Sequence, residues 1–436
     1  MKRHTRNIDR RDFLKLMGVV GLTAVSPWSV GRARAQASDP YDGPIFVTVA
    51  ASGGWDPTSF CDPKENVPGE REITQWSRTL QTGTIVGSPI TYAPFGNNQQ
   101  FFEQFSQDML VFNGIDTETN SHDTGVRFNW SGRIPMGYPA FAAIAGSVFG
   151  SDLPLPFLTN GSYRETAGLV TYTEVNSTRD LQDLVNVNRV PRRESLYHEA
   201  DELALIENAQ QARLTRHMSR SELLPRQRRA LQNLIDARGS RDDLASLLVS
   251  LPDRLDDIDQ DGQRNGLLPQ AQMALVCMEA GLSVAADLDT GGFDTHTNHD
   301  QSQAQALREL TNGVTYLWNT AEQMGLADRL HVLIASDFGR TPFYNGSNGK
   351  DHWPVSSAIL MKKNVAWTNR VVGASDEGHN PLTIDRDTLA PGPGVQITCA
   401  DVQDALRRAS GISDHEVTRR FPLEDQSVNI FDDPAI

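Results

Sequence analysis

The sequence predicts an α/β protein whose parallel or mixed sheet is covered by helices. Short apolar runs of strand length end at turn residues, and amphipathic helical patterns lie between these runs. The 436 residues are 39% hydrophobic and 22% charged, as is typical of a packed globular protein. Because the runs are mostly apolar, without a strict alternation of apolar and polar residues, they indicate strands that are buried on both faces.

The predicted strands follow one another along most of the chain. Each run is bounded by Gly, Asp, Asn, Pro or Ser, which are the residues that favour turns. The short lengths favour strands over buried helices. The five predicted strands are Ile45–Val49, Met109–Phe112, Leu282–Leu288, His331–Ala335 and Ser357–Met361.

Helical patterns lie between the later strands. From Ala304 to Met324 apolar residues recur every three or four positions, which predicts one buried helical face. A second helix is predicted over Pro269–Ala280, with proline near its start and a glycine just past its end. Residues 186–264 are charged and rich in helix formers. They predict a helical insertion in the core, or alternatively two long surface helices of that core.

The first 35 residues differ from the rest and predict an export signal. Six basic residues precede the apolar run Leu16–Val25, and an A-x-A cleavage pattern occupies residues 33–35. The sequence RRDFLK at residues 10–15 fits the twin-arginine form. We therefore predict a twin-arginine signal peptide over residues 1–35, the twin-arginine machinery as a partner, and a periplasmic or secreted location. The alternative is a short amphipathic membrane anchor.

The charge balance limits the partners of the exported chain. The formal net charge is −15, and it becomes −21 without residues 1–35, which carry eight basic and two acidic residues. An acidic surface argues against nucleic acid, whose binding needs basic residues, and favours metal cations. The three cysteines are too few for a disulfide scaffold. No later segment has the apolar length of a membrane span, so no stable span is expected.

Carboxylates and imidazoles gather in loops that follow the predicted strands. In open α/β sheets, ligands bind outside the carboxyl ends of the strands, so we expect these loops to meet at one edge. Such side chains are good ligands for zinc, manganese or iron, and two ions can clamp an anionic ester. Taken singly, each could be an ordinary turn or surface residue. The candidate metal ligands are Asp56, Asp294, His296, Asp337, Asp351 and His352, with His122 and His299 as further candidates.

Several other enzyme signatures are absent. There is no G-x-S-x-G elbow of a serine α/β-hydrolase and no G-x-G-x-x-G after a strand. The glycine and lysine at residues 349–350 lack the other residues of a phosphate-binding P-loop. The imidazole and carboxylate side chains in the loops lead us to expect a divalent metal, zinc among the candidates, present as one or two ions.

The motifs together resemble those of the domain-of-unknown-function 1501 family of exported bacterial proteins. The resemblance rests on GFDTH at residues 292–296, DFGRTP at 337–342 and GKDHWP at 349–354, and it extends from about residue 44 to about residue 412. The motifs GGWD at 53–56 and SH at 121–122 are similar to N-terminal elements of that family. We place one domain at residues 40–412, including the insertion, and an acidic tail at 413–436.

That family in turn resembles the alkaline phosphatase and sulfatase superfamily. The resemblance implies an α/β/α sandwich around a mostly parallel sheet, with two metals in the site. By this analogy Asp56 and Asp337 would hold one ion, and Asp294, His296 and His352 would hold the other.

The same resemblance implies a hydroxyl nucleophile and cations that stabilise substrate oxyanions. Ser121 is the first candidate nucleophile and Thr124 the second. Arg340, Arg127 or Lys350 would contact the oxyanions. The alternative role for Arg340 is a structural pair with a loop carboxylate.

The chain departs from the superfamily pattern at two places. Phe338 stands where an imidazole often follows the aspartate, and Asp294 and His296 are two residues apart where the superfamily spacing is four, so the coordination differs or only one metal binds. The segment from Cys61 to Glu65 lacks the arginine of a sulfatase motif. We predict a metal-dependent hydrolase of phosphate or related esters, acting on a small anionic ester. The alternatives are a non-catalytic exported binding or assembly protein with the same fold, and a polyester- or polysaccharide-related hydrolase.

Overall fold

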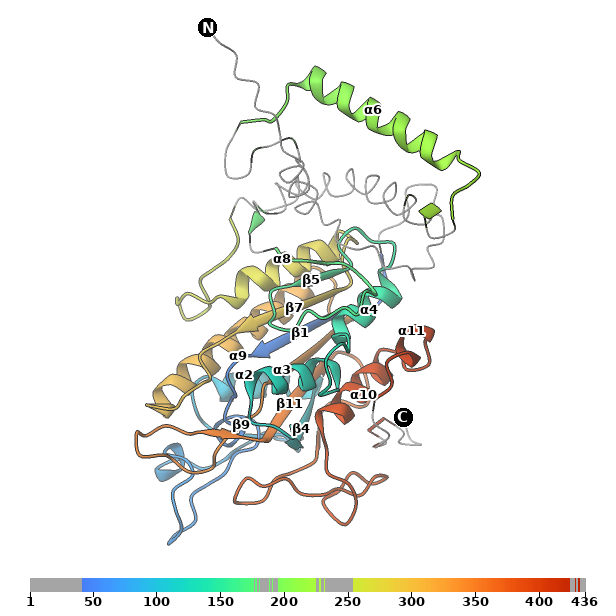
Figure 1. Cartoon of the computed structure of the whole chain (residues 1–436). Coiled ribbons are helices and arrows are strands. Elements are labelled where there is room, and N and C mark those ends of the chain that lie inside the picture. The colour runs from blue at the N-terminus through green and yellow to red at the C-terminus, as the bar shows by residue number, and fades with distance from the viewer. Residues whose placement is uncertain are drawn as a thin grey trace.

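The fold is described from a computed structural model of the chain (Figure 1). The predicted signal peptide over residues 1–35 lies outside the described residues, as does much of the expected helical stretch 186–264. The described residues are 41–423, apart from 176, 179, 181–187, 189, 191–194, 225–226, 229–230 and 232–253, together with 428, 430 and 431.

An eight-stranded sheet forms the centre of the protein, in the order β12-β4-β11-β8-β1-β7-β5-β6. Every neighbouring pair is parallel except the two pairs that β11 makes with β4 and β8. The predicted α/β class with a mostly parallel sheet is therefore confirmed. The strands are β1 (Ile45–Ala51), β4 (Met109–Asp116), β5 (Phe157–Thr159), β6 (Tyr172–Thr173), β7 (Ala285–Thr290), β8 (Leu330–Ser336), β11 (Val355–Lys362) and β12 (Arg370–Val372).

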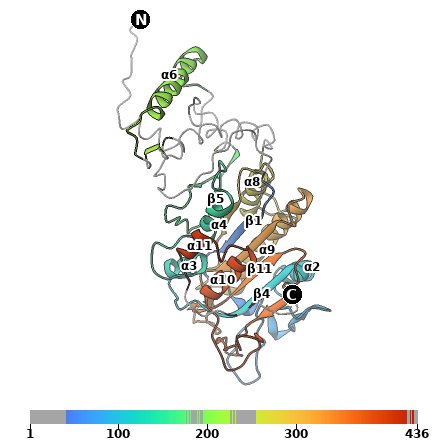
Figure 2. The ribbon, with the colours of Figure 1, turned by 90° about the vertical axis from the view of Figure 1, so that its right-hand side faces the viewer.

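Helices cover both faces of this sheet, as Figure 2 shows. Successive side chains of β1 point to opposite faces, so Val47 packs in one hydrophobic core and Phe46 in the other. The first core contains α2, α8 and α9, and the second contains α3, α4 and α10. The helices are α2 (Asn98–Phe105), α3 (His122–Ser131), α4 (Phe141–Phe149), α6 (Ala200–Met218), α8 (Leu267–Glu279), α9 (His299–Gln323), α10 (Cys399–Ala409) and α11 (Glu416–Arg419).

The predicted elements correspond closely to the observed ones. All five expected strands are present, and all residues of β1, β8 and β11 are buried, as expected of central strands. Strand β7 begins three residues later than expected, because the backbone N–H of Leu282 still bonds to Cys277 in the last turn of α8. Two short ribbons, β2–β3 (Gly83–Thr84 and Thr91–Tyr92) and β9–β10 (Gly339–Arg340 and His352–Trp353), complete the strands.

Within residues 186–264, α6 is the long described helix, and it stands away from the sheet (Figure 1). A capping box between Glu199 and Glu202 fixes its start, and Leu214 is its one buried residue. Part of the expected tail at 413–436 is folded, since α11 packs on α4. No helix in the described part of the chain combines the length and the apolarity that crossing a membrane requires.

Candidate metal centre

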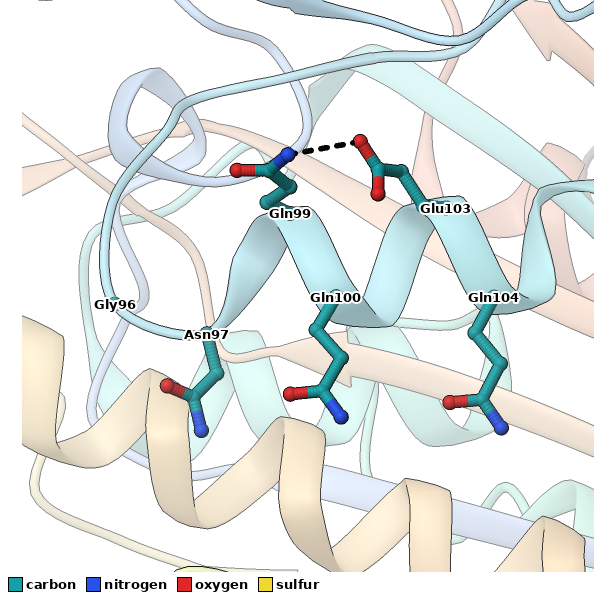
Figure 3. A pocket seen from close by; sticks show the side chains of 6 residues that line it. All are labelled: Gly96, Asn97, Gln99, Gln100, Glu103 and Gln104. Atoms are coloured by element: carbon teal, nitrogen blue, oxygen red, sulfur yellow. Dashed lines mark hydrogen bonds between the residues drawn. The ribbon is translucent and has the colours of Figure 1, made fainter.

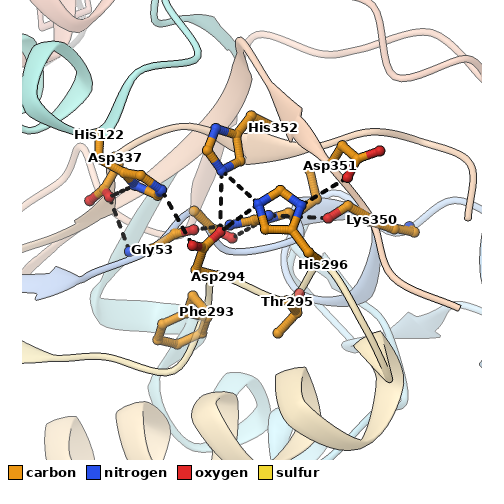
Figure 4. A network of polar contacts seen from close by, with 12 residues as sticks. Gly53, His122, Phe293, Asp294, Thr295, His296, Asp337, Lys350, Asp351 and His352 are labelled. Carbon is orange, nitrogen blue, oxygen red and sulfur yellow. Dashed lines mark hydrogen bonds and ion pairs between the residues drawn. The ribbon is translucent and has the colours of Figure 1, made fainter. Parts of the chain in front are cut away.

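The carboxyl ends of four strands bring the chemically distinctive loops together (Figure 4). His122 begins α3 after β4, Asp294 and His296 follow β7, and Asp337 follows β8. His352 lies in the β9–β10 ribbon, where it pairs with Arg340. The predicted convergence of these loops at one edge is therefore what the fold produces.

Glycines allow these loops to approach one another closely. Gly53 has φ +118°, and a Cβ atom there would lie 2.5 Å from the backbone nitrogen of Asp294. A Cβ atom at Gly349 would likewise collide with the carbonyl oxygen of His296. The loops after β1 and β7, and the segment before β10, therefore pack backbone against backbone.

The Nε2 atoms of three histidines converge on the carboxylate of Asp294. Its Oδ1 lies 3.1 Å from His296 Nε2 and 3.2 Å from His352 Nε2, and its Oδ2 lies 3.6 Å from His122 Nε2. The Nε2 atoms of His296 and His352 are themselves 3.1 Å apart. Ligand atoms of His122, Asp294 and His352 all lie within 4.8 Å of one another, so these three residues form a group that could hold an ion.

Each of these imidazoles is oriented through its other nitrogen. A carboxylate or a backbone carbonyl can only accept a hydrogen bond, so each Nδ1 is the protonated nitrogen. A neutral ring then presents an unprotonated Nε2, the form that ligates a metal, and such an outer partner is usual behind metal-binding histidines. The Nδ1 contacts are His122 with Asp337 Oδ2 at 2.7 Å, His296 with Asp351 Oδ1 at 2.8 Å, and His352 with the Asn120 carbonyl at 2.8 Å.

This arrangement places the lone pairs of the imidazole Nε2 atoms next to one another and next to those of the Asp294 carboxylate. With all three rings neutral, three Nε2 acceptors and a carboxylate face one another, which is unfavourable unless a proton or a metal ion lies between them. The side chains of the four residues are 23 to 49% exposed, so an ion or a substrate can reach them. The donor set of imidazole and carboxylate suits zinc and similar divalent ions.

Arg340 holds Asp294 from beneath. Its fully buried guanidinium donates to Asp294 Oδ1 at 2.6 Å, to the Lys350 carbonyl at 3.1 Å, and to the carbonyl oxygens of Gly53 and Gly54. Burial acts to raise the pKa of Asp294, but the hydrogen bond and charge of Arg340 outweigh it and lower that pKa. Arg340 thus forms a structural pair with a loop carboxylate, which was the alternative to its expected contact with substrate oxyanions. Its guanidinium has no exposed surface with which to contact a substrate.

Asp337 and Asp351 lie behind the imidazoles. Burial raises the pKa of Asp337, while hydrogen bonds from His122 and from the Gly53 backbone favour its ionised form. The hydrogen bond from His296 lowers the pKa of the exposed Asp351. Both carboxylates were expected to be metal ligands, and in the structure each forms a hydrogen bond with the Nδ1 of an imidazole of the cluster.

The structure places Asp56 and His299 in a separate, fully buried network. The Asp56 carboxylate accepts hydrogen bonds from Thr58, Ser59, His299 and Lys350, and the Lys350 Nζ lies 2.7 Å away. Burial would raise the pKa of Asp56, but Lys350 and His299 hold it far below its usual range. With its oxygens occupied by these donors, Asp56 is not placed to share an ion with Asp337, and Lys350 is not placed to contact an oxyanion.

The expected nucleophiles lie at the start of α3. Ser121 is the exposed N-cap residue, and its side chain makes no capping hydrogen bond. Thr124 is partly exposed in the first turn. Arg127 donates to the Ile134 carbonyl at 2.7 Å.

Sequence reasoning ranked His122 too low, because a single histidine in a loop is usually an ordinary surface residue. The feature of the sequence that could have identified His122 is its position, at the end of the loop that follows a central strand and at the start of a helix. Phe338, where an imidazole was expected from the resemblance, is fully buried beneath the cluster. Its ring centroid lies 4.8 Å from that of His122 and 4.5 Å from that of His352.

A hollow on α2 lies apart from this cluster (Figure 3). Its volume is about 570 Å³, and amide side chains dominate its lining. It shares no residue with the cluster. The lining residues are Gly96, Asn97, Gln99, Gln100, Glu103 and Gln104.

Solved structures with some likeness to this chain include three whose names state an activity. The PsFucS1 sulfatase from Pseudoalteromonas sp. has 9% identity and a TM-score of 0.39, covering 85% of this chain and 68% of its own. Alkaline phosphatase from the Antarctic bacterium TAB5 has 9% identity and a TM-score of 0.34, covering 85% and 99%. The lipoteichoic acid synthase LtaP from Listeria monocytogenes has 8% identity and a TM-score of 0.35, covering 92% and 78%. At these scores the likenesses carry no conclusion about the reaction.

Comparison of the sequence with protein families gives a direct match. The model described as "Protein of unknown function (DUF1501)" matches residues 45–377. No curated protein matches the chain. The matched span includes all the residues of the histidine cluster and its outer partners.

Proposed function

Because the chain belongs to the family described as a protein of unknown function (DUF1501), a description that gives no reaction, we propose its function from the metal centre itself. The proposed function is that of an exported, metal-dependent hydrolase of phosphate or related esters. The observation that carries it is the convergence of the Nε2 atoms of His122, His296 and His352 on the Asp294 carboxylate.

One divalent ion fits the donor set better than two. His122, Asp294 and His352 would hold it, with His296 beside them as a fourth donor. The expected second site would need Asp56, whose carboxylate is occupied by Lys350 and other donors. Few protein ligands and partial exposure are typical of catalytic rather than structural zinc sites. An ion bound there would polarise an ester oxygen and lower the pKa of a coordinated hydroxyl or water.

The remaining parts of the proposed site come from α3. Ser121 adjoins His122 and offers a hydroxyl that is not used as a helix cap, and Thr124 offers a second one. Because α3 begins at His122, the partial positive charge of its first turn lies at the cluster and favours an anionic substrate. This supports a small anionic ester as the substrate class, with Ser121 as nucleophile.

A second candidate function is a non-catalytic exported protein that binds one ion and serves in binding or assembly. Phe338 favours it, because an apolar ring fills the position at which an imidazole was expected. The two functions make different predictions for Ser121.

The test uses the full chain exported and purified from a bacterial host, with its metal content measured by elemental analysis. We expect about one divalent ion per chain. Asp294→Ala and His352→Ala should lose it, and His217→Ala on α6 should keep it. Ser121→Ala should keep the ion and lose hydrolysis of phosphate monoester and diester substrates. Absence of metal from the wild type would overturn the proposal, and metal without turnover would favour the binding protein.

A further inference from the structure

Lys350 and Asp56 form an ion pair in the interior of the protein. Both side chains are 0% exposed, and the Lys350 Nζ lies 2.7 Å from Asp56 Oδ2. Lys350 also donates to the Thr58 hydroxyl at 3.2 Å. Neither residue is among the candidate metal ligands, so metal binding by these side chains does not explain why a charged pair is buried here.

A directed chain of hydrogen bonds continues from Asp56 toward the loop after β7. His299 Nε2 lies 2.9 Å from Asp56 Oδ2, and His299 Nδ1 lies 2.7 Å from the hydroxyl of Thr295. Gln303 donates to the same hydroxyl at 3.1 Å. The donors thus run in one direction, from Gln303 through Thr295 and His299 to the Asp56 carboxylate.

The two arms of this network end beside two of the converging imidazoles. Thr295 immediately precedes His296, and Lys350 precedes His352 by two residues. The arms are also joined directly, since the Lys350 backbone N–H donates to the Thr295 carbonyl at 3.1 Å. The network therefore fastens the segment that carries His296 to the segment that carries His352.

Stability alone does not account for such a pair. Removing two charges from water costs about as much as their attraction returns, so an apolar pair of the same volume would be as stable. We propose that the Asp56–Lys350 pair is a positioning device, which holds residues 294–296 and 350–352 at the spacing where the imidazoles converge. The inference rests on the proposed metal centre and adds residues that act on it indirectly.

The chain contains a matched pair for comparison. Lys64 and Asp62 are 3.1 Å apart, with side chains 9% exposed. In the described part of the chain, the other hydrogen bonds of these two side chains are with Ser375, whose carbonyl accepts from Lys64 and whose hydroxyl donates to Asp62. This second buried pair thus has the same chemistry without a contact to the segments that carry His296 and His352.

The experiment neutralises each pair by the same substitutions. In Asp56→Asn/Lys350→Met, the retained oxygen can still accept from Thr58, and the new amide can donate to the other tautomer of His299. The control is Asp62→Asn/Lys64→Met. Zn²⁺ affinity is measured by competition with a chromophoric chelator, the site geometry by Co²⁺ absorption, and Tm by calorimetry of the metal-free proteins.

We expect Zn²⁺ affinity to fall about 10- to 100-fold in the first variant, as for other outer-shell substitutions, with a changed Co²⁺ spectrum. The control should bind like the wild type. If the first variant does not fold, Thr295→Val cuts the same network without a charge change, and it should weaken Zn²⁺ binding severalfold. Wild-type affinity and spectrum in the first variant, or in Thr295→Val where that is used, would overturn this inference alone. Failure of the wild type to bind Zn²⁺ would overturn the proposed function, on which the inference rests.

Discussion

The Nε2 atom of His296 lies 3.1 Å from the Nε2 atom of His352, and each ring directs its Nδ1 to an acceptor. In neutral rings this places two lone pairs face to face. Both atoms are also 3.1 to 3.2 Å from one carboxylate oxygen of Asp294. The contact is unfavourable unless a proton or a metal ion lies between these atoms.

Removing the metal should lower the stability of the protein. A bound ion stabilises the folded state by about 4 kcal/mol when its free concentration is a thousand times Kd. Dialysis against a chelator should therefore lower Tm measured by calorimetry, and added Zn²⁺ should restore it. His352→Ala serves as the control, since its Tm should respond to neither treatment. An unchanged Tm in the wild type after complete metal removal would contradict the prediction.

His122 and His299 should respond differently to substitution by alanine. His122 is partly exposed and presents its Nε2 to the cluster, so His122→Ala should weaken Zn²⁺ binding more than about tenfold with little change in the Tm of the metal-free protein. His299 is fully buried between Asp56 and Thr295. His299→Ala should lower the free energy of unfolding by about 2–4 kcal/mol, because it leaves a cavity and unpaired polar groups. Chelator competition and urea unfolding measure the two effects, and identical behaviour of the variants would refute the distinction.

Arg340→Gln should both destabilise the protein and disturb Asp294. The change removes a buried charge that donates to three backbone carbonyls and to Asp294. Loss of one partner of a buried network typically lowers the free energy of unfolding by about 3–5 kcal/mol. Because Asp294 is about half exposed, we expect a decrease of about 2–3 kcal/mol here. Urea unfolding of the metal-free protein gives this value. Arg329→Gln is the control, since the Arg329 guanidinium donates to the Tyr41 and Gly43 carbonyls, far from the cluster. Equal losses in both variants would show that Arg340 has no special role at Asp294.

Asp287 should make stability depend on pH away from the metal centre. Burial raises its pKa from 3.8 to about 7, although the Thr48 hydroxyl donates to it. Between these values the folded state keeps a proton that the unfolded state has lost, so the free energy of unfolding falls as pH rises. The free energy of unfolding falls by at most about 1.4 kcal/mol per pH unit, and by about 4 kcal/mol in total. The contribution is fully present below pH 3.8 and is lost by about pH 7.

Asp287→Asn removes this titration and isolates its effect. The amide cannot ionise, so the stability of the wild type relative to this variant should decline steadily from about pH 4 to about pH 7 and then stay level. Urea unfolding at a series of pH values measures the difference. A constant difference over this range would show that Asp287 does not retain its proton in the folded state.

Much of the fold was predictable from local patterns. Runs such as Ile45–Val49 and His331–Ala335 are apolar at all but one position, which is typical of a sheet covered on both faces. Because parallel strands end at a common edge, the sequence predicted that the loops after them would meet there, and His122, Asp294 and Asp337 are in contact in the structure. The absence of thiolate motifs likewise restricted a metal to imidazole and carboxylate.

The role of each individual residue could not be predicted from such local patterns. Asp56 and Asp294 both follow glycine-rich turns after central strands, yet one is sealed in the interior with Lys350 and the other is half exposed among imidazoles. The difference arises from long-range contacts. Lys350, 294 residues away from Asp56, enters the core and occupies its carboxylate, while Arg340 directs Asp294 outward.

The sequence by itself therefore determined the class of fold, the edge of the sheet that carries the chemistry, and the kinds of ligand present there. Only the tertiary structure decided which imidazole nitrogens face one another, which carboxylates orient them, and which are paired inside. The physical reason is that hydrophobic periodicity is encoded within short segments. Burial, tautomer and ion pairing depend instead on which distant groups the packed loops place within 3 to 4 Å of each side chain.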